Sequence, residues 1–178
     1  MCVVPLSSIA MTGKVLAVIA GVALTGLAPA AAAEDPPIYR GPAEVVGPAM
    51  LSLAGKRIVL YGVDAPVKGQ PCQAGNKTWD CATASAKTLL NLIGTQEITC
   101  EQRRTDQFGR VFAICKAGDV DINRALVEAG MAVALPKETT DYVDAEAAAK
   151  AKGIGIWRGP FMAPADYREM LAGHPQER

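Results

Sequence analysis

The residues best suited to chemistry gather in one short segment, Arg104-Thr105-Asp106-Gln107-Phe108-Gly109-Arg110. Guanidinium groups stabilise negative charge on phosphoryl oxygens, and together with Arg103 and Lys116 these arginines could form a local basic patch. Two purely structural interpretations stay open. Arg110 could pair with Asp106 across the turn, and a cationic hairpin face is often simply solvated. His174, the only histidine, is assigned no catalytic role.

The N-terminal region has the pattern of an export signal. An apolar run over residues 15–27 is followed by the alanine-rich stretch 28–33, which offers a small-residue cleavage site. We therefore predict that residues 1–33 are a secretory signal peptide and that the protein is periplasmic or secreted. The run is roughly 13 residues long, whereas a membrane span needs about 20, so no membrane anchor is expected in the mature form. Whether translation starts at Met1 or Met11 stays open.

The charge balance limits which kinds of partner the protein attracts over long range. The chain has 18 Lys and Arg against 18 Asp and Glu, and loss of residues 1–33 would remove one cation, Lys14, and no acid. A near-neutral domain exerts little long-range attraction on a polyphosphate. Nucleic acid is therefore possible but disfavoured as an obligate partner, and the partner stays unidentified.

Four cysteines follow the predicted signal peptide, and an even number in an exported chain favours two disulfides. Of the three possible pairings, we favour Cys72–Cys81, which closes a short loop, and Cys100–Cys115, which joins two predicted neighbouring strands. A metal site built from all four thiolates is disfavoured because the sequence has no CxxC pair.

Hydrophobic patterning places the elements around these residues. Residues 34–43 are expected to be an extended lead-in that is not a packed element, and residues 64–80 a loop. Strands are expected at 44–46, 50–53, 57–63, 97–101 and 110–116, with short extended pieces at 119–121 and 132–135. Helices are expected at 81–93, at 122–129 with Asp121 as its cap, from Thr140 or Asp141 to 152, and at 164–171. Short strands with interleaved helices suggest a small α+β domain built on a closed barrel.

Four motifs in this order resemble the staphylococcal-nuclease-like (thermonuclease) family. They are Ile58-Val59-Leu60-Tyr61-Gly62-Val63-Asp64-Ala65-Pro66, the Arg104–Arg110 turn, the Asp121–Ala132 helix and Gly153-Ile154-Gly155-Ile156-Trp157. The resemblance implies an OB-type five-stranded β-barrel with about three helices over residues 44–160, followed by a C-terminal extension at 161–178. Gln70-Pro71-Cys72 and Trp79-Asp80-Cys81 resemble the exported bacterial branch, which supports the first disulfide.

Active members of this family hydrolyse phosphodiesters of DNA and RNA using calcium, and the resemblance assigns that chemistry position by position. The family's metal-binding motif falls on Gly47-Pro48-Ala49-Met50, its first catalytic arginine on Val59 and its water-activating glutamate on Val67. Asp64, a metal ligand in the family, and Arg110, its second catalytic arginine, are retained.

The family's nucleotide-stacking aromatic positions fall near Leu135 and Glu138, which are not aromatic. Tyr142 keeps an aromatic side chain in register with the family pattern. Loss of stacking removes about 1 to 3 kcal/mol of affinity per base. The resemblance therefore predicts a catalytically impaired or inactive domain, serving in binding or as a scaffold, with no cofactor. The alternative is a weak calcium-dependent phosphodiesterase acting on DNA or RNA, for which Ca²⁺ would be required. An exported module that binds a peptide or an oligosaccharide is a third possibility.

Overall fold

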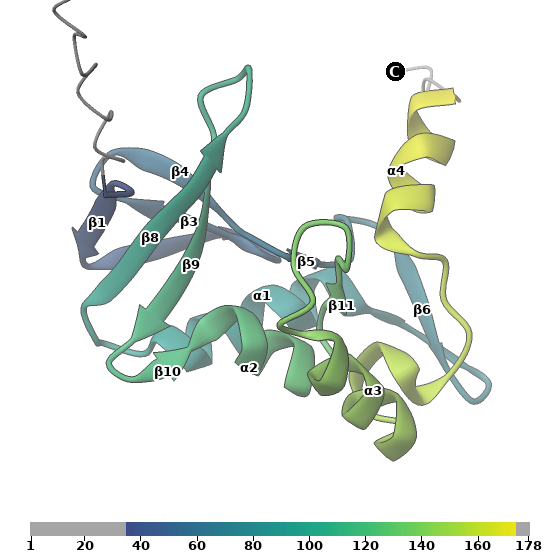
Figure 1. Ribbon diagram of the computed structural model, residues 1–178. Helices are drawn as coiled ribbons and strands as arrows, with labels where there is room; N and C mark the ends of the chain where they lie inside the picture. The colour runs from purple at the N-terminus through teal and green to yellow at the C-terminus, as the bar shows by residue number, and fades with distance from the viewer. Residues whose placement is uncertain (1–34, 174–178) are drawn as a thin grey trace, which may run out of the picture. The chain divides into compact units, whose positions relative to one another are not determined.

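A curled sheet is the centre of the fold, with strand order β1-β8-β9-β4-β3-β2 (Figure 1). The computed structural model describes residues 35–173, so the predicted signal peptide and His174 lie outside the described residues. All neighbours pair antiparallel except β4 and β9, which are parallel, and the short β10 extends β9. The strands are β1 (Ile38–Gly41), β2 (Ala43–Gly47), β3 (Met50–Leu53), β4 (Lys56–Leu60), β8 (Ile98–Thr105), β9 (Val111–Ala117) and β10 (Val120–Asp121).

The predicted lead-in is the part of the sequence interpretation that the sheet corrects. Residues 38–41 form β1, which pairs with β8, while β2 pairs with β3. Only Pro42 separates β1 from β2, so one bent stretch of chain passes from one edge of the sheet to the other. Pro42 lacks a backbone N–H and Gly41 has φ +138°, which together produce the bend. The chain itself thus completes the ring of an OB-type α+β fold, and that predicted fold class is confirmed.

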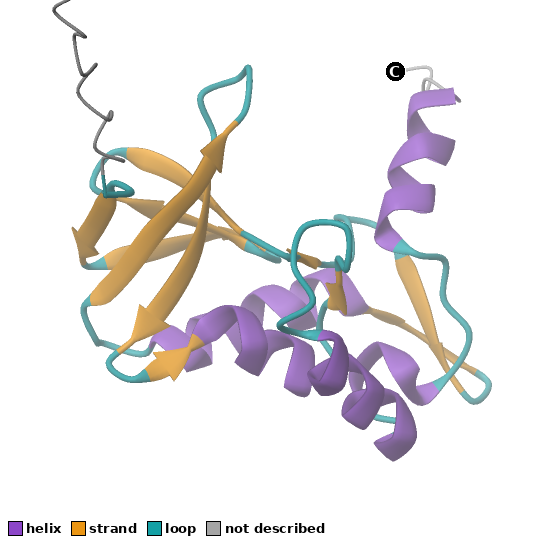
Figure 2. Cartoon of the chain, in the orientation of Figure 1, coloured by secondary structure: helices purple, strands orange, loops and turns teal. Residues whose placement is uncertain are grey.

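Among the described residues, two helices lie along one end of the curled sheet, a third packs against the second of these, and a fourth stands apart (Figure 2). They are α1 (Cys81–Ile93), α2 (Ile122–Glu128), α3 (Val143–Lys152) and, apart from these, α4 (Pro164–Gly173); a 3-10 turn, η1, covers Gly155–Arg158. The Asp80 and Asp121 carboxylates cap α1 and α2, accepting the amides of Thr83 at 2.9 Å and Arg124 at 3.0 Å. In residues 35–173, no helix is long and apolar enough to cross a membrane.

The core lies between the sheet and the first two helices. Leu51, Ile58 and Leu60 from the sheet pack with Leu89 of α1 and Leu126 of α2, all at most 1% exposed. Such closely packed apolar side chains supply most of the stabilisation of a small domain. The core therefore fixes β4, which leads into the turn at residues 61–62, and α2, whose Asn123 side chain donates to the Tyr61 carbonyl in that turn.

The predicted loop over residues 64–80 contains regular structure and is a second correction. It begins with β5 (Val63–Asp64), which pairs with β11 (Val133–Ala134), and ends with a hairpin of β6 (Pro71–Ala74) and β7 (Lys77–Asp80). These strands are too short and too exposed for a clear alternating pattern. Packing on η1 stabilises the hairpin, because Cys72, Cys81 and Ile156 form a small separate core.

Both preferred cysteine pairings are present. The Cys72–Cys81 disulfide links the hairpin to the start of α1, and Cys100–Cys115 joins directly opposed residues of β8 and β9. All four cysteines are completely buried. The disulfides therefore act as structural links beside the two parts of the core.

Candidate binding pocket

A pocket of about 450 Å³ opens at the rim of the sheet, where strand ends meet the segments after β5 and β11. Every metal-binding and catalytic family position considered from the sequence lines this pocket, although these positions span more than 60 residues of chain. They are Gly47, Ala49, Met50, Asp64, Val59, Val67 and Arg110. The structure therefore places the retained and the substituted positions at one site.

One wall of the pocket is apolar. Met50 of β3 lies opposite Val59 of β4 in the sheet register. The β2–β3 turn is held in place by backbone contacts, because the Leu60 amide donates to the Ala49 carbonyl at 3.0 Å and the Ser85 hydroxyl of α1 donates to the Pro48 carbonyl at 3.0 Å. This wall has no carboxylate to offer a hard cation.

The residues present do not fit a calcium site. Calcium takes six to eight oxygen ligands, usually with several carboxylates among them. Within residues 35–173, no group of three or more His, Cys, Asp or Glu side chains is arranged to hold a metal ion. Asp64 is the one carboxylate at a family metal position in the pocket.

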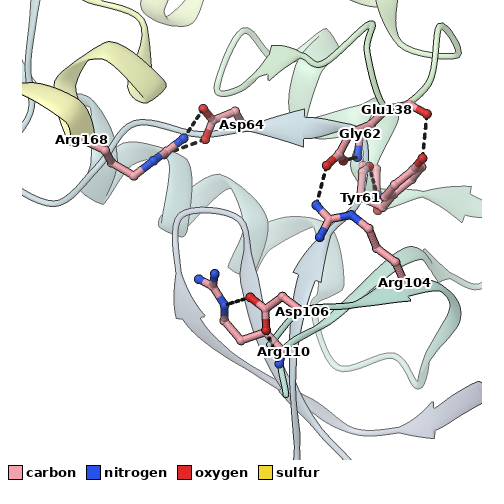
Figure 3. A network of polar contacts seen from close by, with 9 residues as sticks. Tyr61, Gly62, Asp64, Arg104, Asp106, Arg110, Glu138 and Arg168 are labelled. Carbon is pink, nitrogen blue, oxygen red and sulfur yellow. Dashed lines mark hydrogen bonds and ion pairs between the residues drawn. The ribbon is translucent and has the colours of Figure 1, made fainter. Parts of the chain in front are cut away.

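Asp64 is instead bound by an arginine from the C-terminal helix. Arg168 of α4 donates from its two terminal nitrogens to the two carboxylate oxygens, at 2.9 and 2.6 Å (Figure 3). These hydrogen bonds to Asp64 raise the pKa of the Arg168 guanidinium. The Asp64 side chain is only 12% exposed, so the ion pair is partly shielded from water. No sequence signal pointed to Arg168, which lies in the segment interpreted as an extension.

Arg110 pairs with Asp106, as one of the two open interpretations predicted. Its Nε lies 2.6 Å from Oδ2, while the other carboxylate oxygen accepts the amides of Phe108 and Arg110 at 2.9 and 3.0 Å. Partial burial favours a higher pKa for Asp106, but the hydrogen bonds from Arg110 and Phe108 outweigh it, and the pKa is lowered. Within residues 35–173 the terminal nitrogens of Arg110 make no hydrogen bond, so they stay available to the pocket.

A third ion pair forms the far side of the pocket. Arg104 pairs with one carboxylate oxygen of Glu138, and the other oxygen accepts the Gly62 amide at 3.0 Å (Figure 3). The Arg104 guanidinium also stacks 3.5 Å from the centre of the Phe112 ring. A carboxylate that links two segments thus occupies a position where the resemblance implied an aromatic platform.

Tyr142 is not available for stacking on a ligand, which corrects the expectation from the sequence. Its side chain is 1% exposed and lies beneath the pocket against Gly62. Burial, with the nearby charges of Asp121 and Asp141, raises the pKa of its hydroxyl. The ring is part of the support of the turn at residues 61–62.

The lining carries more positive than negative groups. Its cations are Lys68, Arg104, Arg110 and Arg168, and its anions are Asp64 and Glu138. The chain as a whole has a formal net charge of zero, so overall composition gave no sign of this local excess. A concave, partly apolar site with convergent cations suits a ligand that has both an anionic group and an apolar part.

An OB-type ring with this pocket at its rim is the architecture of a nuclease-like domain. The family described as staphylococcal nuclease homologue matches residues 57–159, and the chain belongs to it. The matched range contains Val59, Asp64, Val67 and Arg110, while the apolar turn at 47–50 and α4 lie outside it.

Two curated relatives have names that refer to different activities. A succinoglycan biosynthesis protein, ExoI, from Rhizobium meliloti is 35% identical over 122 residues, covering 66% of this chain and 64% of the relative. An uncharacterized endonuclease from Haemophilus influenzae is 32% identical over 103 residues, covering 57% of this chain and 53% of the relative. The matches thus span less than two thirds of each relative's length.

Proposed function

We propose that this SNase-family domain is an exported binding module that holds an anionic ligand in the rim pocket and does not hydrolyse phosphodiesters with calcium. The observation that carries the proposal is the state of the metal positions. One carboxylate, Asp64, lies there, and both of its oxygens are bonded to Arg168. Two buried disulfides agree with export, because such bonds persist in oxidising compartments.

The expected loss of catalysis is large. A positioned acid or base contributes roughly 10² to 10⁴ in rate, and a charge-stabilising arginine contributes about 10³ to 10⁵ in phosphoryl transfer. Val67 and Val59 stand where those two groups would act, and the carboxylates of the metal-binding motif at residues 47–50 are missing as well. These contributions do not simply add, yet their joint absence leaves little basis for hydrolysis.

The lining charges support binding of an anion. Arg104 and Arg110 are 43% and 39% exposed on their side chains, so a ligand can reach their guanidinium groups. Each already has a carboxylate partner, which fixes its position without using all of its donors. The apolar wall at Met50 and Val59 would contact an uncharged part of the ligand.

Calorimetric titration of the mature, oxidised protein with inorganic pyrophosphate tests the binding. We expect binding that weakens at least about tenfold in Arg110→Ala, because a charge-assisted hydrogen bond is lost. Arg40→Ala is the matched control, since it removes the same charge from an exposed position on β1 outside the pocket. The absence of binding in the unsubstituted protein would contradict the proposed function.

Incubation with single-stranded DNA and RNA in the presence of calcium tests the lack of hydrolysis. We expect no cleavage above the background given by the Arg110→Ala variant. Calcium-dependent cleavage that Arg110→Ala abolishes would refute the proposal. Succinoglycan is a second test ligand, because the name of the Rhizobium meliloti relative refers to its biosynthesis.

The alternative is a weak calcium-dependent phosphodiesterase. One observation favours it: Asp64 and Arg110, which the family resemblance links to catalysis, share the same pocket. The Haemophilus influenzae relative is also named an endonuclease. Calorimetry with calcium discriminates between the two functions, because the alternative requires a calcium site that disappears in Asp64→Asn.

A further inference from the structure

We propose that Arg168 takes the place of a bound cation against Asp64 and thereby makes the pocket selective for anions. This inference rests on the proposed function and names the residue that sets its ligand class. The relevant observation is the pairing of both Asp64 oxygens with both terminal nitrogens of one guanidinium. A planar guanidinium satisfies a carboxylate in this geometry without any further ligand.

The chain leading into α4 is fixed to the pocket wall by a buried side chain. Gln70 is 1% exposed, its amide nitrogen donates to the Met162 carbonyl at 2.7 Å, and its amide oxygen accepts the Val67 amide at 2.9 Å. One residue thus connects the loop that carries Val67 to the segment that precedes α4. Because both of its polar groups are satisfied, this buried connection defines where α4 begins.

Polar contacts then place the body of α4. Among residues 164–173 only Pro164 is buried, so the helix adds little to the apolar core. Tyr167 donates its hydroxyl to the Gly69 carbonyl at 3.0 Å, and the next residue, Arg168, reaches Asp64. These two contacts tie one turn of α4 to the end of β5 and to the loop after it, and they set the guanidinium at the pocket.

The pairing changes what the pocket can hold. Without Arg168, the mostly buried Asp64 carboxylate would lie unpaired in the lining and would repel an anion. With Arg168, the charge of Asp64 is compensated, and the cations Lys68, Arg104 and Arg110 act on the ligand with less opposition. Arg168 is therefore a specificity-determining residue whose effect depends on Asp64.

Pyrophosphate titrations of four proteins test this dependence: the unsubstituted chain, Arg168→Ala, Asp64→Asn and the double variant. The net charge of the lining falls in Arg168→Ala, rises in Asp64→Asn and returns to its starting value in the double variant. We expect Arg168→Ala to bind about tenfold or more weakly. Asp64→Asn should bind at least as tightly as the unsubstituted chain, and the double variant should recover to within about threefold of it.

Each result separates this inference from the proposed function. If the unsubstituted chain binds but the double variant stays as weak as Arg168→Ala, Arg168 acts by touching the ligand and the inference is wrong. If Arg168→Ala binds as tightly as the unsubstituted chain, the inference is also wrong, while the proposed function stands. If the unsubstituted chain does not bind, both fail. Circular dichroism of each variant, with Arg40→Ala as the charge-matched control, shows whether the fold is retained.

Discussion

The support beneath the pocket and the rim around it differ in how their residues are held. The support consists of buried, closely packed residues such as Asn123, Tyr142 and Gly155, and Asn123 and Gly155 belong to the motifs that resemble the family. The rim is partly exposed and is built from three ion pairs, Arg168–Asp64, Arg110–Asp106 and Arg104–Glu138. The comparison indicates that the buried motif positions report packing requirements, whereas the proposed function depends on exposed rim residues, some of them also in the motifs, whose substitution we expect the fold to tolerate.

Asn123 of α2 illustrates the support. It is completely buried, its amide nitrogen donates to the Tyr61 and Ala113 carbonyls at 2.8 and 3.1 Å, and its amide oxygen accepts the Cys115 amide at 3.1 Å. These bonds join the helix to β9 and to the turn after β4. These hydrogen bonds alone account for the presence of an asparagine at this position of the helix motif.

Gly155→Ala should have the largest effect and would break the support. A Cβ at this position would lie 2.0 Å from the Gly130 carbonyl oxygen, and Gly155 has φ +60°. The backbone of one motif glycine thus blocks any side chain on the other. We expect a loss of at least about 4 kcal/mol in the free energy of unfolding, measured by denaturant titration.

Gly69→Ala is the matched control for that substitution. Gly69 has φ +82°, but nothing lies within 4 Å of an added Cβ. Only conformational strain remains, for which we expect about 1 kcal/mol. Equal losses in the two variants would show that the close approach of Gly130 and Gly155 does not limit the fold.

Asn123→Ala should have the next largest effect. It leaves the Cys115 amide and two carbonyl groups without their side-chain partner in the core. We expect a loss of about 3 kcal/mol in the free energy of unfolding, since each unsatisfied buried group costs about 1 to 3 kcal/mol. Asn91→Ala, on the exposed face of α1, is the control and should change stability by less than about 0.5 kcal/mol. A small loss in Asn123→Ala would mean that water replaces the amide.

The same contrast explains which features could be predicted from the sequence. Strong periodicity and local caps predicted the helix at Cys81–Ile93 and the Asp121 cap, because both depend on residues close together in the chain. The strand at residues 38–41 was missed, because Gly41 and Pro42 indicate a loop unless the distant β8 is known to pair there. Arg168 was missed for a related reason: its partner lies 104 residues away, and an ion pair leaves no periodic pattern.

Arg104→Ala tests the rim and should have little effect on stability. The Arg104 side chain is 43% exposed and pairs with Glu138. Exposed ion pairs contribute about 0 to 1 kcal/mol, so we expect the free energy of unfolding to change by less than about 1 kcal/mol. Pyrophosphate binding should weaken clearly in the same variant. A large loss of stability without any change in binding would mean that Arg104 belongs to the support of the fold and not to the ligand-binding rim.

The smallest effect expected is a pH dependence at the Asp106–Arg110 turn. Hydrogen bonds from Arg110 and Phe108 more than offset partial burial and lower the pKa of Asp106 in the folded chain. A carboxyl group with a lowered pKa stabilises the fold above its unfolded pKa, which is about 3.9, and that stabilisation is lost as the pH falls through the folded value. Denaturant titrations from pH 6 down to pH 3 should therefore show the stability difference between the unsubstituted chain and Asp106→Asn shrinking only below about pH 4. Because the turn is exposed to solvent, the change should be small and should decrease further in salt. A difference that stays constant over this range would show that Asp106 holds Arg110 by geometry alone, without a contribution from its charge.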